Sequence, residues 1–188
     1  MNNGNSCRAR EYNIETESLT ISSFRKSDIP EYAAIVADSE VTKFLGAGSP
    51  HSYEQATAYI LDCIGSEAEE GLARYAVIHK ETGELIGFCG FKKASDYIDL
   101  GWRYARRVWG SGYATEAAVA VLDYGISTLK LSGIVAESAV ENIGSVRVIE
   151  GIGMQFQAFE VRGRKTVRYR QPNEPIAGAD TAVAAMKP

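Results

Sequence analysis

The chain contains little cysteine and little histidine. Its three cysteines, Cys7, Cys63 and Cys89, are far apart and form no CxxC pair. An odd, scattered set of this kind argues against a disulfide framework and against a zinc site, so we expect reduced thiols and no bound metal. The two histidines, His51 and His79, are too few for a histidine-rich metal centre and give little support to a Ser-His-Asp triad.

Long apolar runs and an excess of positive charge are also missing. The apolar run 117–122 is far shorter than the roughly 20 residues that span a bilayer. The polar residues 1–10 lack the apolar stretch of a secretory signal, so we expect a cytoplasmic protein without a membrane segment. Twenty Lys and Arg stand against 24 Asp and Glu, for a formal charge of −4, which argues against a nucleic-acid partner held through its phosphates.

The length and the composition predict one folded domain. A chain of 188 residues has the usual size of a single domain with a substantial core. Residues 1–17 are polar, and residues 172–188 are rich in Ala, Gly and Pro. We therefore expect flexible ends on either side of a domain that covers residues 18–171.

Hydrophobic periodicity predicts the secondary structure of that domain. The expected strands are 19–24, 75–79, 85–91, 97–102, 134–138, 154–161 and 165–170. One expected helix begins at Pro30, one runs from His51 or Ser52 to near Gly65, and two more cover 114–125 and 142–150. This order predicts an α/β protein of the α+β type, with a mixed sheet that is antiparallel at its start and contains a strand-helix-strand crossover in its middle.

A glycine-rich turn, Arg107-x-x-Gly110-x-Gly112, lies between an expected strand and an expected helix. The two glycines permit unusual backbone conformations and leave peptide N–H groups open to a ligand at the positive end of the helix. The turn therefore indicates a phosphate site, and a purely structural tight turn is the other open interpretation. A P-loop would need a Gly-Lys-Ser/Thr triplet, and a dinucleotide fingerprint would need a third glycine or alanine where Thr115 stands, so both fit less well.

The turn and several separate motifs together resemble the GNAT acetyltransferase superfamily, and most of all the branch of ribosomal-protein N-terminal acetyltransferases. The turn, followed by Tyr-Ala-Thr-Glu-Ala117, resembles that family's coenzyme A pyrophosphate motif. The other motifs, in the order of the branch, are Arg25-Lys-Ser-Asp28, Glu40-Val-Thr-Lys-Phe-Leu45, Leu85-Ile-Gly87, Asp99-Leu-Gly-Trp102 and Asn142-x-x-Ser145-x-Arg147. The resemblance covers residues 19–170 and implies a central, mostly antiparallel sheet, flanked by helices, with a V-shaped splay between two parallel strands.

The resemblance also implies where a cosubstrate would lie. Acetyl-CoA would occupy the V between the strand at 97–104 and the strand at 134–138, with its pyrophosphate on the amides of 108–114. The residues that would bind it are Trp102, Arg103, Tyr104, Arg107, Val108, Trp109, Gly110, Ser111, Gly112, Tyr113, Ala114 and Asn142.

Two catalytic residues follow from the same resemblance. Ser145 matches a position that protonates the leaving sulfur, although a solvent-facing or intrahelical role is the alternative. Asp99 is a candidate proton relay or amine anchor, with a solvated strand residue as its alternative. Asn142 is also suited to a helix N-cap. Glu160 and Tyr104 are further candidates on the acceptor side.

The leading hypothesis is therefore an N-acetyltransferase that moves an acetyl group directly from acetyl-CoA to a primary amine within a ternary complex. The acceptor would be a protein N-terminal α-amine or a small-molecule amine, and the protein would be a monomer or a homodimer. The alternatives are a non-catalytic acyl-CoA-binding sensor and a dinucleotide-binding oxidoreductase. The sequence identifies neither the acceptor nor the acyl group.

Overall fold

A computed structural model describes residues 13–161 and 165–171, which form a single sheet with helices on both faces. The strands are β1 (Asn13–Glu15), β2 (Leu19–Ser22), β3 (Arg74–His79), β4 (Leu85–Lys93), β5 (Ile98–Tyr104), β6 (Ile134–Ala139), β7 (Gln155–Val161) and β8 (Lys165–Arg170). The α-helices are α1 (Ile29–Val36), α2 (Ser39–Thr42), α3 (Tyr53–Glu70), α4 (Tyr113–Ser127) and α5 (Ile143–Gly151), and the 3-10 helices are η1 (Lys26–Asp28) and η2 (Arg106–Val108).

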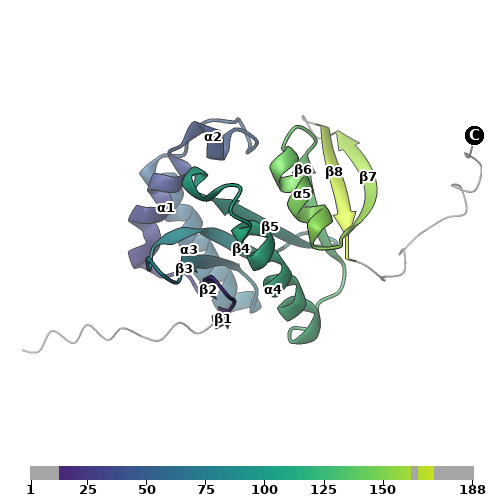
Figure 1. The fold of residues 1–188 in the computed structure, drawn as a ribbon, viewed down its shortest axis with the longest axis horizontal. Helices are drawn as coiled ribbons and strands as arrows, with labels where there is room; N and C mark the ends of the chain where they lie inside the picture. Colours follow the sequence, from purple (N-terminus) through teal and green to yellow (C-terminus); the bar gives the residue numbers. More distant parts are fainter. Residues whose placement is uncertain (1–12, 162–164, 172–188) are drawn as a thin grey trace, which may run out of the picture.

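The eight-stranded sheet has the order β1-β2-β3-β4-β5-β6-β8-β7. Every neighbouring pair is antiparallel except β5 and β6, which are parallel. Figure 1 shows β6, β8, β7 and α5 grouped on one side of the molecule, and α1, α2 and α3 on the other, with β5 and α4 between them. The expected mixed, mostly antiparallel sheet is thus confirmed.

The parallel pair is short, and this shapes the whole molecule. Only two residue pairs form its ladder, Ile98 with Ile134 and Asp99 with Val135. Beyond them, β5 continues along β4 and β6 continues along β8. The two strands therefore separate after Asp99, which confirms the expected V-shaped splay.

Helix α4 covers one face of the sheet with small side chains. Its buried residues are Ala117, Ala118, Val121, Leu122 and Gly125, as the spacing predicts. A Cβ atom added to Gly125 would collide with the ring of Phe91 on β4, so glycine sets how closely the helix approaches the sheet. Glu116 fixes the start of this helix, because its Oε1 accepts hydrogen bonds from Thr16 Oγ1 (2.6 Å) and from the Ser18 amide (2.7 Å).

Helices α1 and α3 cover the opposite face with aromatic packing. The rings of Tyr32 and Tyr59 stack with centroids 5.3 Å apart, and the ring of Tyr59 lies 5.5 Å from that of Phe88 on β4. A capping box between Ser52 and Gln55 starts α3 at the expected place. The sheet thus has a small-residue face toward α4 and an aromatic face toward α3.

The end of α3 was wrongly predicted at Gly65. The helix runs on to Glu70 and ends at Gly71, which has a φ of 68° and is the left-handed cap. A glycine inside a helix costs only about 1 kcal/mol, and the Ser-Glu-Ala-Glu-Glu segment that follows Gly65 sustains the helix.

Strand β1 was also missed, because an alternation of only three residues, Asn-Ile-Glu, is too short to indicate a strand. Asn13–Glu15 pairs with β2, so the loose segment expected at 1–17 does not extend over these residues. The rest of that expectation, at 1–12, lies outside the described residues, as do the expected tail at 172–188 and the link at Gly163.

Candidate active site

The glycine turn adopts the geometry of an anion site. Gly110 and Gly112 have φ values of 79° and 87°, and a Cβ atom on either would meet nothing within 4 Å. Gly112 is the N-cap of α4 and offers no side chain to the first turn. Because the first N–H groups of a helix have no acceptor within it, those of α4 are available to an anionic ligand.

Hydrogen bonds from the Trp109 side chain and from the backbone hold this turn in place. The Trp109 indole Nε1 donates to the carbonyl oxygen of Tyr104 at 2.9 Å. The amides of Val108 and Trp109 donate to the carbonyl oxygens of Ala105 and Arg106 at 3.1 Å each. Trp109 is half exposed and fastens the turn to the end of β5. The indole N–H already donates to the Tyr104 carbonyl oxygen, which leaves that oxygen one further acceptor site. The main-chain contact of Tyr104 with the cosubstrate stays a prediction.

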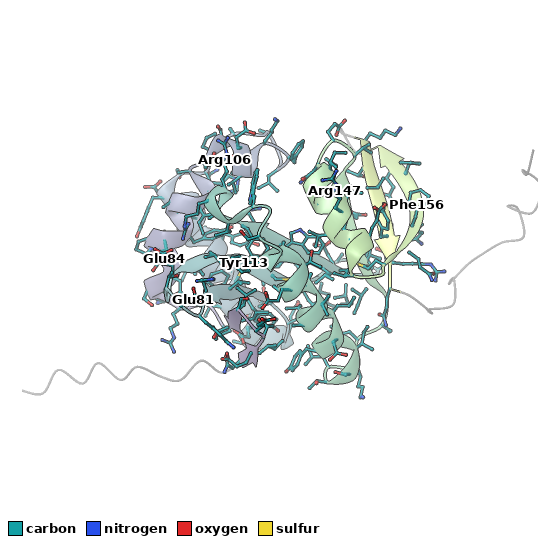
Figure 2. All side chains as sticks on the ribbon, viewed as in Figure 1. Glu81, Glu84, Arg106, Tyr113, Arg147 and Phe156 are labelled. Atoms are coloured by element: carbon teal, nitrogen blue, oxygen red, sulfur yellow. The ribbon has the colours of Figure 1, made fainter. Side chains whose placement is uncertain are left out.

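Two side chains of the predicted turn point toward neighbouring elements. Arg107 Nη2 lies 3.0 Å from Glu84 Oε2, and Tyr113 Oη lies 2.9 Å from His79 Nε2. In Figure 2, Tyr113 lies at the start of α4, and Arg106 and Glu84 lie on the side of the molecule that contains α1. Binding by Arg107 and Tyr113 is therefore expected mainly from their peptide groups.

A cavity of about 290 Å³ lies where β5 and β6 separate. It brings together Asp99, Trp102, Arg103 and Ser145 from the predicted site. Its other lining residues are Leu45, Tyr59, Arg74, Phe88, Lys92, Leu100, Gly101 and Glu137. The turn residues 107–114 and Asn142 do not line this cavity. A separate cavity of about 590 Å³, between α1 and the β3–β4 turn, is lined by Arg106 and Arg107 among others.

Asp99 lies at the point of separation and is paired with a buried arginine. Arg74 donates from Nη2 to Asp99 Oδ2 and from Nη1 to the Asp99 carbonyl (2.9 Å) and to the Gly90 carbonyl. Burial is the largest single effect and acts to lower the pKa of Arg74, but the charge of Asp99, its hydrogen bond and the neighbouring Tyr59 and Cys89 together raise it. A Cβ atom on Gly101 would lie 2.9 Å from Arg74 Nη2, so the glycine makes room for the ion pair. Asp99 is thus the counter-ion of Arg74. This pairing suits the predicted role of an amine anchor better than that of a general base.

Asn142 and Ser145 lie at the start of α5. The Asn142 Oδ1 accepts the Ser145 amide at 3.3 Å, which confirms the N-cap role. Ser145 lines the cavity, and its hydroxyl has no protein partner within the described residues. The carrier-binding role of Asn142 and the acid role of Ser145 stay predictions.

Glu137 is a cavity residue that the sequence analysis missed. Its carboxylate accepts from Arg168 Nε at 2.7 Å and lies 3.5 Å from Tyr97 Oη. Arg168 also pairs with Glu160 at 3.0 Å, so the candidate Glu160 belongs to the same ion-pair network. The available signal was one carboxylate inside the otherwise small and apolar strand Ile134–Ala139.

Tyr104 does not belong to the acceptor side. Its ring is 5% exposed and packs in the core beside α4, and burial raises the pKa of its hydroxyl well above the usual value. The prediction of an acceptor-side Tyr104 is therefore wrong, because alternation along β5 turns this side chain away from the Asp99 face.

The two described cysteines are free and buried. Burial raises the pKa of both the Cys63 and the Cys89 thiol to about 12. Neither supplies a thiolate nucleophile near neutral pH.

Over the described residues, no cluster of three or more His, Cys, Asp or Glu is suited to a metal ion. Within the same ranges, no helix combines the length and the apolar character needed to cross a membrane.

Comparisons with known proteins agree with this geometry. The family model described as the acetyltransferase (GNAT) domain matches residues 18–155. The uncharacterized N-acetyltransferase p20 of Bacillus licheniformis is 31% identical over 150 residues, which cover 78% of this chain and 84% of that protein.

Solved structures show the same fold. An acetyltransferase of the GNAT family from Bacillus anthracis superposes with a TM-score of 0.75 at 27% identity, over 84% of this chain and 96% of that one. The ribosomal L7/L12 α-N-protein acetyltransferase RimL, solved with coenzyme A, has a TM-score of 0.75 at 14% identity over 85% of this chain and 97% of its own. Sequence match, fold and splayed strands together show that this chain belongs to the GNAT acetyltransferase family and is an acyltransferase.

Proposed function

We propose that the protein transfers an acetyl group from acetyl-CoA to a primary amine by direct transfer in a ternary complex. One observation carries this proposal: the β5–β6 ladder ends at Asp99 and Val135, and a cavity lies where the strands part. The end of β5 then leads through the glycine turn into α4. This arrangement offers an acyl carrier one site for its phosphates and another for its reacting end.

The residues of the turn fit a pyrophosphate. The left-handed Gly110 and Gly112, together with the first turn of α4, present peptide N–H groups and the positive end of a helix dipole. The main chain of Trp102 to Tyr104, at the open edge of the V, is suited to the pantetheine. These assignments cover the predicted cosubstrate residues, which are Trp102 to Tyr104, Arg107 to Ala114, and Asn142 at the start of α5.

Acetyl-CoA supplies an acetyl group that is activated as a thioester. Main-chain N–H groups at the open edge of β5 would stabilise the carbonyl oxygen as negative charge develops on it. Ser145 lines the cavity and would donate its hydroxyl proton to the departing sulfur. The neutral acceptor nitrogen would form the new bond to the acetyl carbon as the C–S bond breaks, and the proton that it loses would pass to water while Ser145 takes a proton back from water.

Glu137 and Asp99 place two carboxylates in the cavity that would receive the acceptor. Both are engaged with arginines, so they would anchor the incoming ammonium and would not act as strong bases. An α-amine, with a pKa of about 8, loses its proton more easily than a lysine at about 10.4. An acceptor amine of low pKa therefore suits this site. We place the catalytic domain at residues 18–171, acting as a monomer or a homodimer.

Calorimetric titration with acetyl-CoA, CoA and NAD tests the proposal. The wild-type protein should bind acetyl-CoA and CoA, and Gly112→Glu should lose at least about tenfold in affinity, because a carboxylate there repels the pyrophosphate. Gly71→Glu is the matched control: it adds the same charge at another left-handed glycine with open space around it, at the far end of α3.

Turnover completes the test. Ser145→Ala should bind acetyl-CoA normally and lower kcat by about tenfold or more if the hydroxyl is the acid. An unchanged kcat would remove Ser145 from that role. Normal acetyl-CoA binding without turnover of any amine would favour a sensor, and binding of NAD in place of CoA would favour an oxidoreductase.

A further inference from the structure

The charges around the acceptor cavity are paired with one exception. Arg74 is paired with Asp99, Glu137 with Arg168, and Lys92 with Asp62 on α3 at 3.0 Å. Arg103 also lines the cavity, and within the described residues it has no carboxylate partner. The cavity therefore contains one guanidinium whose charge the protein does not neutralise.

Arg103 is held in place by aromatic groups. Its Nη1 donates to Tyr32 Oη at 2.7 Å. Its guanidinium carbon lies 5.6 Å from the ring centroid of Tyr59 and 5.3 Å from that of Phe88. These contacts orient the group, yet the Arg103 Nε is buried and has no hydrogen-bond partner in the described part of the chain. The side chain is thus rigid, charged and only partly satisfied.

The charge of Arg103 also acts on its surroundings. The pKa of His51, in the loop before α3, is lowered first by burial and then by the charge of Arg103. The positive charge of Arg103 therefore acts beyond the cavity, on the loop before α3.

We infer that the acceptor is a small primary amine that also carries an anionic group, and that Arg103 binds this group; the inference rests on the transferase function proposed above. Asp99 and Glu137 line the same cavity, and each carboxylate has acceptor sites beyond those that its arginine uses, so they would accept from the ammonium end while Arg103 meets the anionic end. A guanidinium presents donors that suit both carboxylate and phosphate. The volume of about 290 Å³ lies at the small end of ligand pockets, which span about 300–1,000 Å³, and favours a small molecule over a protein chain.

Matched pairs of acceptors test this inference. The first set contains ω-amino carboxylates, with the acid two to six atoms from the nitrogen, and their neutral methyl amides. The second set contains aminoalkyl phosphates and the corresponding amino alcohols, which separates the two sources of negative charge. The wild-type protein should show a kcat/KM about 10- to 100-fold higher for the anionic member of at least one pair.

Variants assign the preference to Arg103. Arg103→Met keeps the main chain at this position and the apolar packing against Tyr59 and Phe88, and should lower kcat/KM about 10- to 100-fold more for the anionic amine than for its neutral partner. Arg103→Lys should retain part of the preference, because lysine keeps the positive charge but lacks the planar guanidinium that donates two parallel hydrogen bonds. Arg170→Met, on β8 opposite Val135 and outside the residues that line the cavity, removes one positive charge and should leave the preference intact.

Calorimetry with acetyl-CoA and a thermal melt accompany each variant. The inference fails if the wild type prefers neutral amines or acidic peptide N-termini, or if Arg103→Met lowers kcat/KM equally for both members of a pair; the transferase function would then stand. If the wild type does not bind acetyl-CoA, or acetylates no amine, the proposed function itself fails.

Discussion

The two faces of β5 show opposite chemistry along one short strand. Leu100 and Tyr104 point into the core under α4 and are 1% and 5% exposed. Asp99 and Arg103 alternate with them and line the cavity on the aromatic side. A strand that reverses its side-chain direction at every residue separates an apolar wall from a charged one without any additional element.

This difference also divides what each face can tolerate. The α4 face depends on close contact between a small-residue helix and the sheet. The α3 face contains the buried Arg74–Asp99 ion pair, in which the loss of one partner leaves the other charge without compensation. Substitutions on the α4 face should destabilise the protein through steric overlap. Substitutions on the α3 face should destabilise it through uncompensated charge.

The largest effect is expected from Asp99→Ala. The substitution leaves Arg74, which is 9% exposed, without a counter-ion, and should lower the free energy of unfolding by about 3 kcal/mol. Chemical denaturation measures this loss. Arg74→Met combined with Asp99→Ala should recover a part of it, while Asp96→Ala in the exposed loop should change stability by less than about 0.5 kcal/mol. A loss below about 1 kcal/mol for Asp99→Ala would contradict the electrostatic account.

A smaller effect, of opposite sign at two glycines, tests the α4 face. Gly125→Ala should destabilise the protein by about 1 kcal/mol, because the new methyl group meets the buried ring of Phe91 and this outweighs the helix propensity gained. Gly65→Ala, inside α3 with open space around it, should stabilise by about 0.5–1 kcal/mol. Thermal and denaturant unfolding compare them. A stability change of the same sign in both variants would contradict the steric role of Gly125.

The smallest effect concerns the titration of His51. Burial, and then the charge of Arg103, lower its pKa below the usual 6.5. The folded state therefore binds this proton less tightly than the unfolded state. The resulting destabilisation is absent above pH 6.5, grows as the pH falls through the lowered pKa, and is complete below it. NMR titration of the ring should show a higher pKa in Arg103→Met and no change in Arg170→Met. A lower or unchanged pKa in Arg103→Met would show that the Arg103 charge does not reach His51.

The sequence predicted those parts of the molecule that depend on local pattern. Alternation located seven of the eight strands, and the missing one, β1, is three residues long. The small-residue spacing of α4 gave its buried face, and the Gly110 and Gly112 pair gave the left-handed turn. Each of these features depends on the pattern of about a dozen neighbouring residues.

Contacts between distant segments could not be predicted in the same way. Arg74 and Asp99, Glu137 and Arg168, and Arg103 and Tyr32 lie far apart in the chain and meet only after folding. Whether a polar side chain is a solvated strand residue or one half of a buried pair depends on what the sheet places opposite it. Asp99 was therefore found as a candidate while its counter-ion was not, and Glu137 escaped notice altogether.

The two-residue ladder between β5 and β6 also bears on how the chain folds. A parallel pair can form only after a crossover brings distant segments together. Here very few backbone hydrogen bonds offset the entropy that this loop closure costs. The β6–β8 portion is joined to the rest by the side chains of β6 beside β5 and by the packing of α5 on α4. A small rotation about this seam would break few backbone bonds. The molecule is therefore most compliant where its two strands part, and the width of the opening is set by side chains that can repack.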